Sequence, residues 1–323
     1  MAHNHAHGIT AGTTGPADGA GIAGPNGNGH VRRLIATLSL TGTVFVAEVI
    51  GAVITGSLAL FVDAGHMLTD LSVLAASTVT AILMRRRPTT TRTWGWARLE
   101  VITATGGAVA LLFVGVYALA EAVMRLLGLG GKEVQDPVLL LVFGVIGLLA
   151  NIGSMLILMG QRGANMNMRA AFLEVVNDAL GSVAVIASAA LVMTIGWGGF
   201  DSIAGGVIAL MMIPRAIGLL HSGMRVLLEE TPDGLDLAAV RRHLEGVPNV
   251  VAVHDLHAST VATGMPRLTA HIVVDSLDPA DYVATLEKLH DCLREHFPVS
   301  VEHTTFQLEP RGYRATAAES VHK

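Results

Sequence analysis

The residues best placed to do chemistry are two pairs of ionisable side chains inside apolar stretches: His66 with Asp70, and Glu174 with Asp178. Residues four apart project from the same face of a helix, so each pair presents its side chains in one direction. Ionisable groups are costly to bury in a membrane span and mark a pathway or a binding site. Together the pairs offer one imidazole and three carboxylates, a ligand set that Zn²⁺ accepts in tetrahedral geometry. We therefore predict a divalent metal site between two helices.

Other acidic residues in the apolar stretches make weaker cases. Asp63 lies three residues before His66 on nearly the same helix face, and we predict that it orients the imidazole from behind the ligands. Glu48 is interpreted as a proton relay or a packing partner, and Glu100 as the partner of Arg98 or of another group at the membrane surface. Neither is predicted to be a ligand. A hydrogen bond between helices would explain one buried pair, but it is a weaker explanation of two matched pairs.

The composition predicts that most of the chain lies in lipid. The 323 residues are 51% hydrophobic and 15% charged, with a mean hydropathy of +0.55, which exceeds that of ordinary soluble domains. A helix needs about 20 apolar residues to cross a bilayer. We expect an all-α membrane domain of six spanning helices within residues 31–228, at 33–55, 58–84, 99–127, 137–160, 170–196 and 199–221.

The distribution of arginine predicts the orientation of these spans. Arginines precede the first span and occupy the connections between spans two and three and between spans four and five, whereas the opposite connections contain Lys132 and no arginine. Cytoplasmic loops carry the excess of basic residues. We therefore expect a multi-pass protein of the cell (plasma or inner) membrane with both termini in the cytoplasm. The arginines on the cytoplasmic side are Arg32, Arg33, Arg85, Arg86, Arg87, Arg92, Arg98, Arg162 and Arg169.

Residues 1–30 are rich in glycine and contain His3, His5, His7 and His30. Such a segment has too few apolar groups to form a core, so we expect a disordered cytoplasmic leader and no cleavable signal peptide. Its histidines could capture ions transiently, or the leader could be a solvated tail; both interpretations stay open.

Net charge and cysteine content exclude several classes. The formal charge of −5 lacks the basic excess that nucleic-acid partners require. The single cysteine, Cys292, excludes a disulfide framework and a cysteine-based zinc knuckle. We expect metal ligands to be histidines and carboxylates, and Cys292 to be a buried helix residue.

The sequence becomes polar after Leu228, and residues 229–311 predict a small α+β domain with a short tail at 312–323. Periodicity predicts helix, strand, strand, helix and strand, an αββαβ order. A domain of this size has a thin core and gains stability from dimer contacts or bound metal. The expected elements cover 235–245, 250–259, 267–275, 279–296 and 300–308.

Several segments resemble the cation diffusion facilitators, and the resemblance extends from about residue 31 to residue 310. It implies a homodimeric, proton-coupled exporter of Zn²⁺ and similar ions rather than an enzyme, with no cofactor, a six-helix membrane domain and a cytoplasmic ferredoxin-like domain. Two positions depart from it, because many zinc members have histidine where this chain has Glu174, and relatives often have histidine where it has Ala97. The resemblance is carried by Phe61–Asp70, Thr93–Glu100, Asn151, Ala171–Asp178 and Val253–His257.

The resemblance also implies a metal site in the cytoplasmic domain. His254 or His257 on the first strand, His271 on the second and His303 on the third match metal-binding positions in relatives. We expect a regulatory site there that tightens the dimer, although ordinary surface imidazoles are the other interpretation.

The carboxylate of Glu174 bears on which ion is transported. It is a harder ligand than imidazole, so preference should shift from strict zinc selectivity toward cobalt, cadmium, iron or manganese, with zinc still first. Metal ligands must be deprotonated, so protons leave as the ion arrives and we expect proton antiport.

Three other classes fit less well. A membrane-anchored metal sensor would not need four ligands inside its spans, and an exporter of organic cations would not need His66. An intramembrane hydrolase could use a similar metal site, but the sequence lacks an HExxH motif.

Overall fold

The computed structural model describes residues 42–84, 88–129, 134–159 and 166–313. The predicted leader at 1–30 and tail at 312–323 fall largely or wholly outside these residues. The chain forms two compact units that meet in sequence between Leu228 and Glu229. Each unit is described here by itself.

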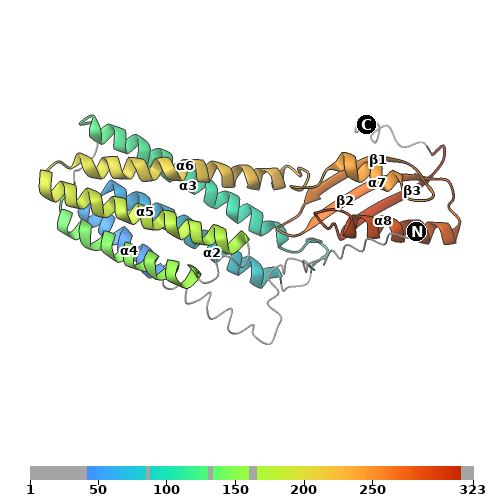
Figure 1. The fold of residues 1–323 in the computed structure, drawn as a ribbon, viewed down its shortest axis with the longest axis horizontal. Helices are drawn as coiled ribbons and strands as arrows, with labels where there is room; N and C mark the ends of the chain where they lie inside the picture. The colour runs from blue at the N-terminus through green and yellow to red at the C-terminus, as the bar shows by residue number, and fades with distance from the viewer. Residues whose placement is uncertain (1–41, 85–87, 130–133, 160–165, 314–323) are drawn as a thin grey trace, which may run out of the picture. The chain divides into compact units, whose positions relative to one another are not determined.

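The first unit is a bundle of long helices (Figure 1). The helix Gly42–Thr55 precedes α2, and α3 packs most extensively on α6 while α4 packs on α5. α2 contacts α3, α6 and α5, so it lies inside the bundle. The labelled helices are α2 (Leu58–Met84), α3 (Ala97–Leu126), α4 (Pro137–Met159), α5 (Met166–Ile195) and α6 (Gly199–Leu227).

Four helices in the described part of the chain are long and apolar enough to cross a membrane, with stretches of 20 to 30 residues in α3, α4, α5 and α6. Their outward surfaces carry large apolar side chains such as Phe113, Leu149 and Leu210, as expected where lipid is the solvent. These observations establish a helical membrane domain. The other two predicted spans correspond to Gly42–Thr55, a shorter apolar helix, and to α2, and the count of six stays a prediction.

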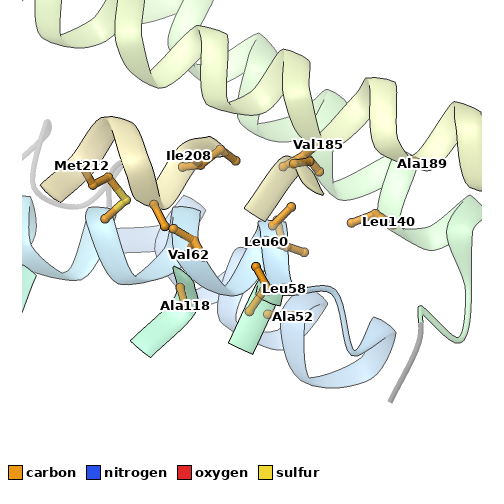
Figure 2. Packing of buried hydrophobic residues seen from close by; sticks show 14 of the residues in the cluster. Ala52, Leu58, Leu60, Val62, Ala118, Leu140, Val185, Ala189, Ile208 and Met212 are labelled. Atoms are coloured by element: carbon orange, nitrogen blue, oxygen red, sulfur yellow. The ribbon is translucent and has the colours of Figure 1, made fainter. Parts of the chain in front are cut away.

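Close packing of small and branched side chains joins α2 to its neighbours. Leu60 and Val62 of α2 belong to the same buried core as Val185 of α5 and Ile208 of α6 (Figure 2). A Cβ added to Gly205 would lie 3.0 Å from the backbone nitrogen of Ala59. Glycine at that position therefore allows α6 to approach the start of α2 closely.

A buried carboxylate of α6 caps the N-terminus of α2. Asp201 accepts hydrogen bonds from the backbone N–H of Leu58 at 2.6 Å, from that of Ala59 at 3.4 Å and from the Ser57 hydroxyl. The first amides of a helix have no partner within the helix, and their partial positive charge favours an anion. Asp201 thus fixes the start of the helix that carries His66.

The second unit contains a three-stranded sheet of order β1-β2-β3 and two helices. β1 pairs with β2 antiparallel, and β2 pairs with β3 parallel. The element order is the predicted αββαβ order, although β3 begins at His303 rather than near 300. The elements are α7 (Leu237–Glu245), β1 (Val250–Thr260), β2 (Pro266–Val274), α8 (Pro279–Glu295) and β3 (His303–Pro310).

Alternation along β2 gives this sheet one buried face and one partly open face. Leu268, Ala270, Ile272 and Val274 are buried and share a core with residues of α7 and α8. Successive strand residues point to opposite faces, so His271 lies on the face away from the two helices.

The cap on α2 predicts a stability difference between two helix-capping carboxylates. Asp201→Ala should lower the free energy of unfolding by about 1–3 kcal/mol, because it leaves buried amides without an acceptor. Asp136→Ala is the matched control, since Asp136 caps α4 through the N–H of Leu139 at an exposed site. Thermal melting in detergent measures both, and equal shifts would contradict the assignment.

Candidate metal sites

An imidazole lies between two carboxylates inside the helical unit. His66 Nε2 is 3.6 Å from Asp70 Oδ2, and His66 Nδ1 is 3.3 Å from Asp178 Oδ1. One ligand atom from each of the three residues lies within 4.8 Å of the other two. The fold therefore brings together three of the four predicted ligands, from the facing helices α2 and α5.

The fourth predicted ligand, Glu174, lies one helical turn before Asp178 in α5. Its side chain falls outside the part of the structure that is described, so its role stays a prediction. The helical spacing places it on the same face of α5 as Asp178.

Asp63 and Glu48 are buried near the same helix interfaces. Asp63 is 6% exposed, and a Cβ on Gly181 of α5 would lie 3.4 Å from its Oδ1. Glu48 is 3% exposed, and a Cβ on Gly147 of α4 would lie 3.0 Å from its Oε1. Glycine at both positions leaves room for a carboxylate between helices. The predicted roles of Asp63 behind His66 and of Glu48 as a relay stay predictions.

Arg215 of α6 is a member of the site that the sequence analysis did not identify. Its Nη1 lies 2.6 Å from His66 Nε2, and its Nη2 donates to Asp70 Oδ1 at 3.4 Å. A guanidinium only donates, so Nε2 is the acceptor and the ring proton belongs on Nδ1, which faces Asp178. A single arginine within an apolar span is itself an unusual feature, and it could have been singled out on that ground.

A second group of candidate ligands lies on the open face of the sheet in the other unit. His254 Nε2 of β1 is 3.0 Å from Glu309 Oε2, and His271 Nδ1 of β2 is 3.0 Å from Glu309 Oε1. Glu309 is only 3% exposed. Two imidazoles and a buried carboxylate form a ligand set that fits a divalent transition metal.

The remaining predicted histidines of this unit lie differently. His257 Nε2 contacts Asp255 Oδ1 at 3.0 Å, and Asp255 Oδ2 is 3.7 Å from His271 Nε2. The parallel register pairs His303 with Arg267, four residues along β2 from His271 and so about 13 Å away. Among the described residues, β3 contributes Glu309 rather than His303 to the group.

Comparison with known proteins identifies the family of this chain. Residues 34–228 match the model of the cation efflux transmembrane domain, and residues 232–311 match that of the cation efflux protein cytoplasmic domain. This chain belongs to the cation diffusion facilitator family. Members of this cation efflux family are transporters rather than enzymes.

The alignments with three curated relatives cover most of this chain. The metal cation efflux system protein CzcD of Cupriavidus metallidurans is 38% identical over 291 residues, covering 90% of each chain. The zinc transporter ZitB of Escherichia coli is 34% identical over 314 residues, covering 96% of this chain and 93% of that one. The cadmium, cobalt and zinc/H⁺-K⁺ antiporter of Bacillus subtilis is 31% identical over 283 residues, covering 87% and 89%.

We call His254, His271 and Glu309 the sheet group. Its geometry predicts that Glu309 contributes to metal binding and that His303 does not. In the full-length protein with Asp70→Ala in the membrane site and His296→Gln at the end of α8, Glu309→Gln should weaken Zn²⁺ binding at the sheet by at least about 10-fold. A ligand between two imidazoles is then lost, and even the loss of an outer-shell partner has an effect of that size. His303→Ala is the matched control and should change little. Competition with a chromophoric chelator measures both, and a larger effect of His303→Ala would mean that β3 contributes the histidine instead.

Proposed function

We propose that this protein exports divalent transition metal ions from the cytoplasm in exchange for protons, with Zn²⁺ as the main substrate. One observation carries the proposal: the His66 ring lies between Asp70 of its own helix and Asp178 of the facing helix. Imidazole and carboxylate ligands at this spacing suit a tetrahedral ion. Relatives named as zinc, cadmium and cobalt transporters support the same substrate class.

The ligands also provide the means of coupling. Glu174 completes the proposed set, and the ion enters as protons and the guanidinium of Arg215 leave the ligand atoms. Reprotonation from the opposite side would release the ion. Two conformations that open the site to each side in turn would make the exchange a transport cycle.

The proposed assembly follows from the same evidence. We expect six spanning helices in the inner membrane with both termini in the cytoplasm, because the basic residues lie in those connections. The cytoplasmic unit is proposed to be ferredoxin-like and to form a homodimer, which the match to the cation efflux cytoplasmic domain supports. The sheet group of His254, His271 and Glu309 would then bind regulatory metal in this unit.

A flux assay tests the transport proposal. Proteoliposomes loaded with a zinc-sensitive dye and given an acidic interior should take up Zn²⁺ only while the pH difference lasts. Asp70→Asn should abolish uptake, since it removes a charged ligand, whereas Asp136→Asn in a connecting segment should leave it intact. Uptake by Asp70→Asn at the wild-type rate would rule out this site. A protein that binds metal without any flux of zinc, cobalt, cadmium or manganese would favour the membrane-anchored sensor.

Selectivity depends on Glu174 in the proposed site. Glu174→His should sharpen zinc over cobalt and cadmium, because imidazole is a softer ligand than carboxylate. Unchanged ratios of the three fluxes in the same liposomes would show that Glu174 does not set selectivity.

Arg215 is expected to compete with the ion for the ligands. Replacing it with glutamine should tighten Zn²⁺ binding roughly three- to tenfold, because a partly exposed cation next to Asp70 is removed. Arg215→Lys keeps the positive charge and serves as the control. Calorimetry of the full-length protein in detergent measures both, and weaker binding by Arg215→Gln would show that the arginine supports the site rather than competing with metal.

A further inference from the structure

A third group of metal-ligating side chains lies apart from both sites, where α7 and α8 end. His243 belongs to the last turn of α7, Cys292 to the last turns of α8, and His296 caps α8. One ligand atom from each lies within 4.8 Å of the others. His243 Nε2 and His296 Nδ1 are 3.0 Å apart. Cys292 is 3% exposed, whereas both histidines are exposed.

The backbone holds these three positions firmly. Cys292 and His296 are four residues apart, so their side chains project from the same face of α8. Leu244 follows His243 and is fully buried, and Leu293 follows Cys292 and is fully buried as well. Both leucines belong to the core that joins the helices to the sheet. The three ligand atoms therefore meet because of helix packing and not because of a flexible loop.

The distance between the two imidazole nitrogens is close to that of a tetrahedral site. With metal–nitrogen bonds of about 2.0–2.1 Å, two imidazole nitrogens on one Zn²⁺ lie about 3.3 Å apart. The observed 3.0 Å between the two rings needs to open by only a few tenths of an ångström. A hydrogen bond between the imidazoles alone would also hold the rings together, but it does not account for a thiol within reach of both.

The electrostatics favour a cation at this place. The C-terminal end of a helix carries partial negative charge, and the C-termini of two helices meet here. The nearest arginine along α8, Arg294, is occupied by Asp291 at 2.9 Å and Glu295 at 3.0 Å.

We propose that His243, Cys292 and His296 form a second metal site in the C-terminal unit, one that binds a soft or borderline divalent cation such as Cd²⁺ or Zn²⁺. A thiolate and two imidazoles suit these ions and disfavour Mg²⁺, Ca²⁺ and Mn²⁺. Water would complete the coordination, since the two histidines are open to solvent. The bound ion would link α7 to α8 on the helix side of the sheet, whereas the group of His254, His271 and Glu309 lies on the opposite face.

The test uses the fact that Cys292 is the chain's only cysteine. Any thiolate-to-metal charge-transfer band in the full-length, metal-stripped protein must come from this site. Titration with Cd²⁺ in detergent should give such a band, saturating at a single ion per chain. Cys292→Ser should remove the band. His296→Gln should weaken the binding that the band reports by at least about 10-fold, since even the loss of an outer-shell partner has an effect of that size. His290→Ala, at another position of α8, is the matched control and should change neither.

Two outcomes would overturn the proposal. One is the absence of the band at Cd²⁺ concentrations that fill the other sites. The other is a band of unchanged affinity in the double variant His243→Ala with His296→Gln, which would mean that the thiol binds Cd²⁺ by itself. His296 is exposed, so its variant should fold even if the change at buried Cys292 does not. The band should persist in Asp70→Asn, which separates this site from the proposed transport function.

Discussion

A charged side chain buried in a membrane helix bundle has to be matched by donors or counter-charges from a neighbouring helix, and α2 is positioned by this constraint. At its N-terminus the backbone amides meet the carboxylate of Asp201 from α6. Two to three turns further along α2, His66 and Asp70 contact the guanidinium of Arg215, which also belongs to α6. Both contacts join α2 to α6, so α2 cannot rotate on α6 without separating them. This arrangement directs His66 toward α5 and Asp178.

Contacts between residues close in sequence could be predicted, whereas contacts between distant residues could not. The His66–Asp70 pair could be predicted because a helix fixes residues four apart on one face. Asp201 and Arg215 could not be assigned, since their partners lie 143 and 149 residues away and no periodicity connects them. An acidic residue at the start of a span and an arginine within one were visible, but their partners depend on how α6 packs on α2.

In the C-terminal unit, too, local structure could be predicted from the sequence and long-range contacts could not. The αββαβ order followed from alternation and helical periodicity, but strand register does not follow from a single sequence. The parallel pairing of β2 with β3 places Gln307 beside His271 and moves His303 to the other end of the strand. Glu309 consequently lies beside the histidines, although its type and its place near a strand end gave no reason to select it. Cys292 was expected to be buried, and it is, but only the packing of α7 on α8 brings His243 close to it.

Arg215 also bears on how metal and proton would exchange. If Glu174 completes the membrane site as proposed, three carboxylates and one guanidinium carry a net double negative charge when His66 is neutral. A divalent ion cancels that charge, and so do two protons. An isolated charge is unfavourable in a low-dielectric interior, so the loaded site and the doubly protonated site would be the stable forms. Without the arginine, the same carboxylates would need three protons to reach neutrality. Among these ligands alone, the permanent cation on α6 would lower the number of protons needed for neutrality from three to two, while its contact with His66 Nε2 has to open before that nitrogen can bind the ion.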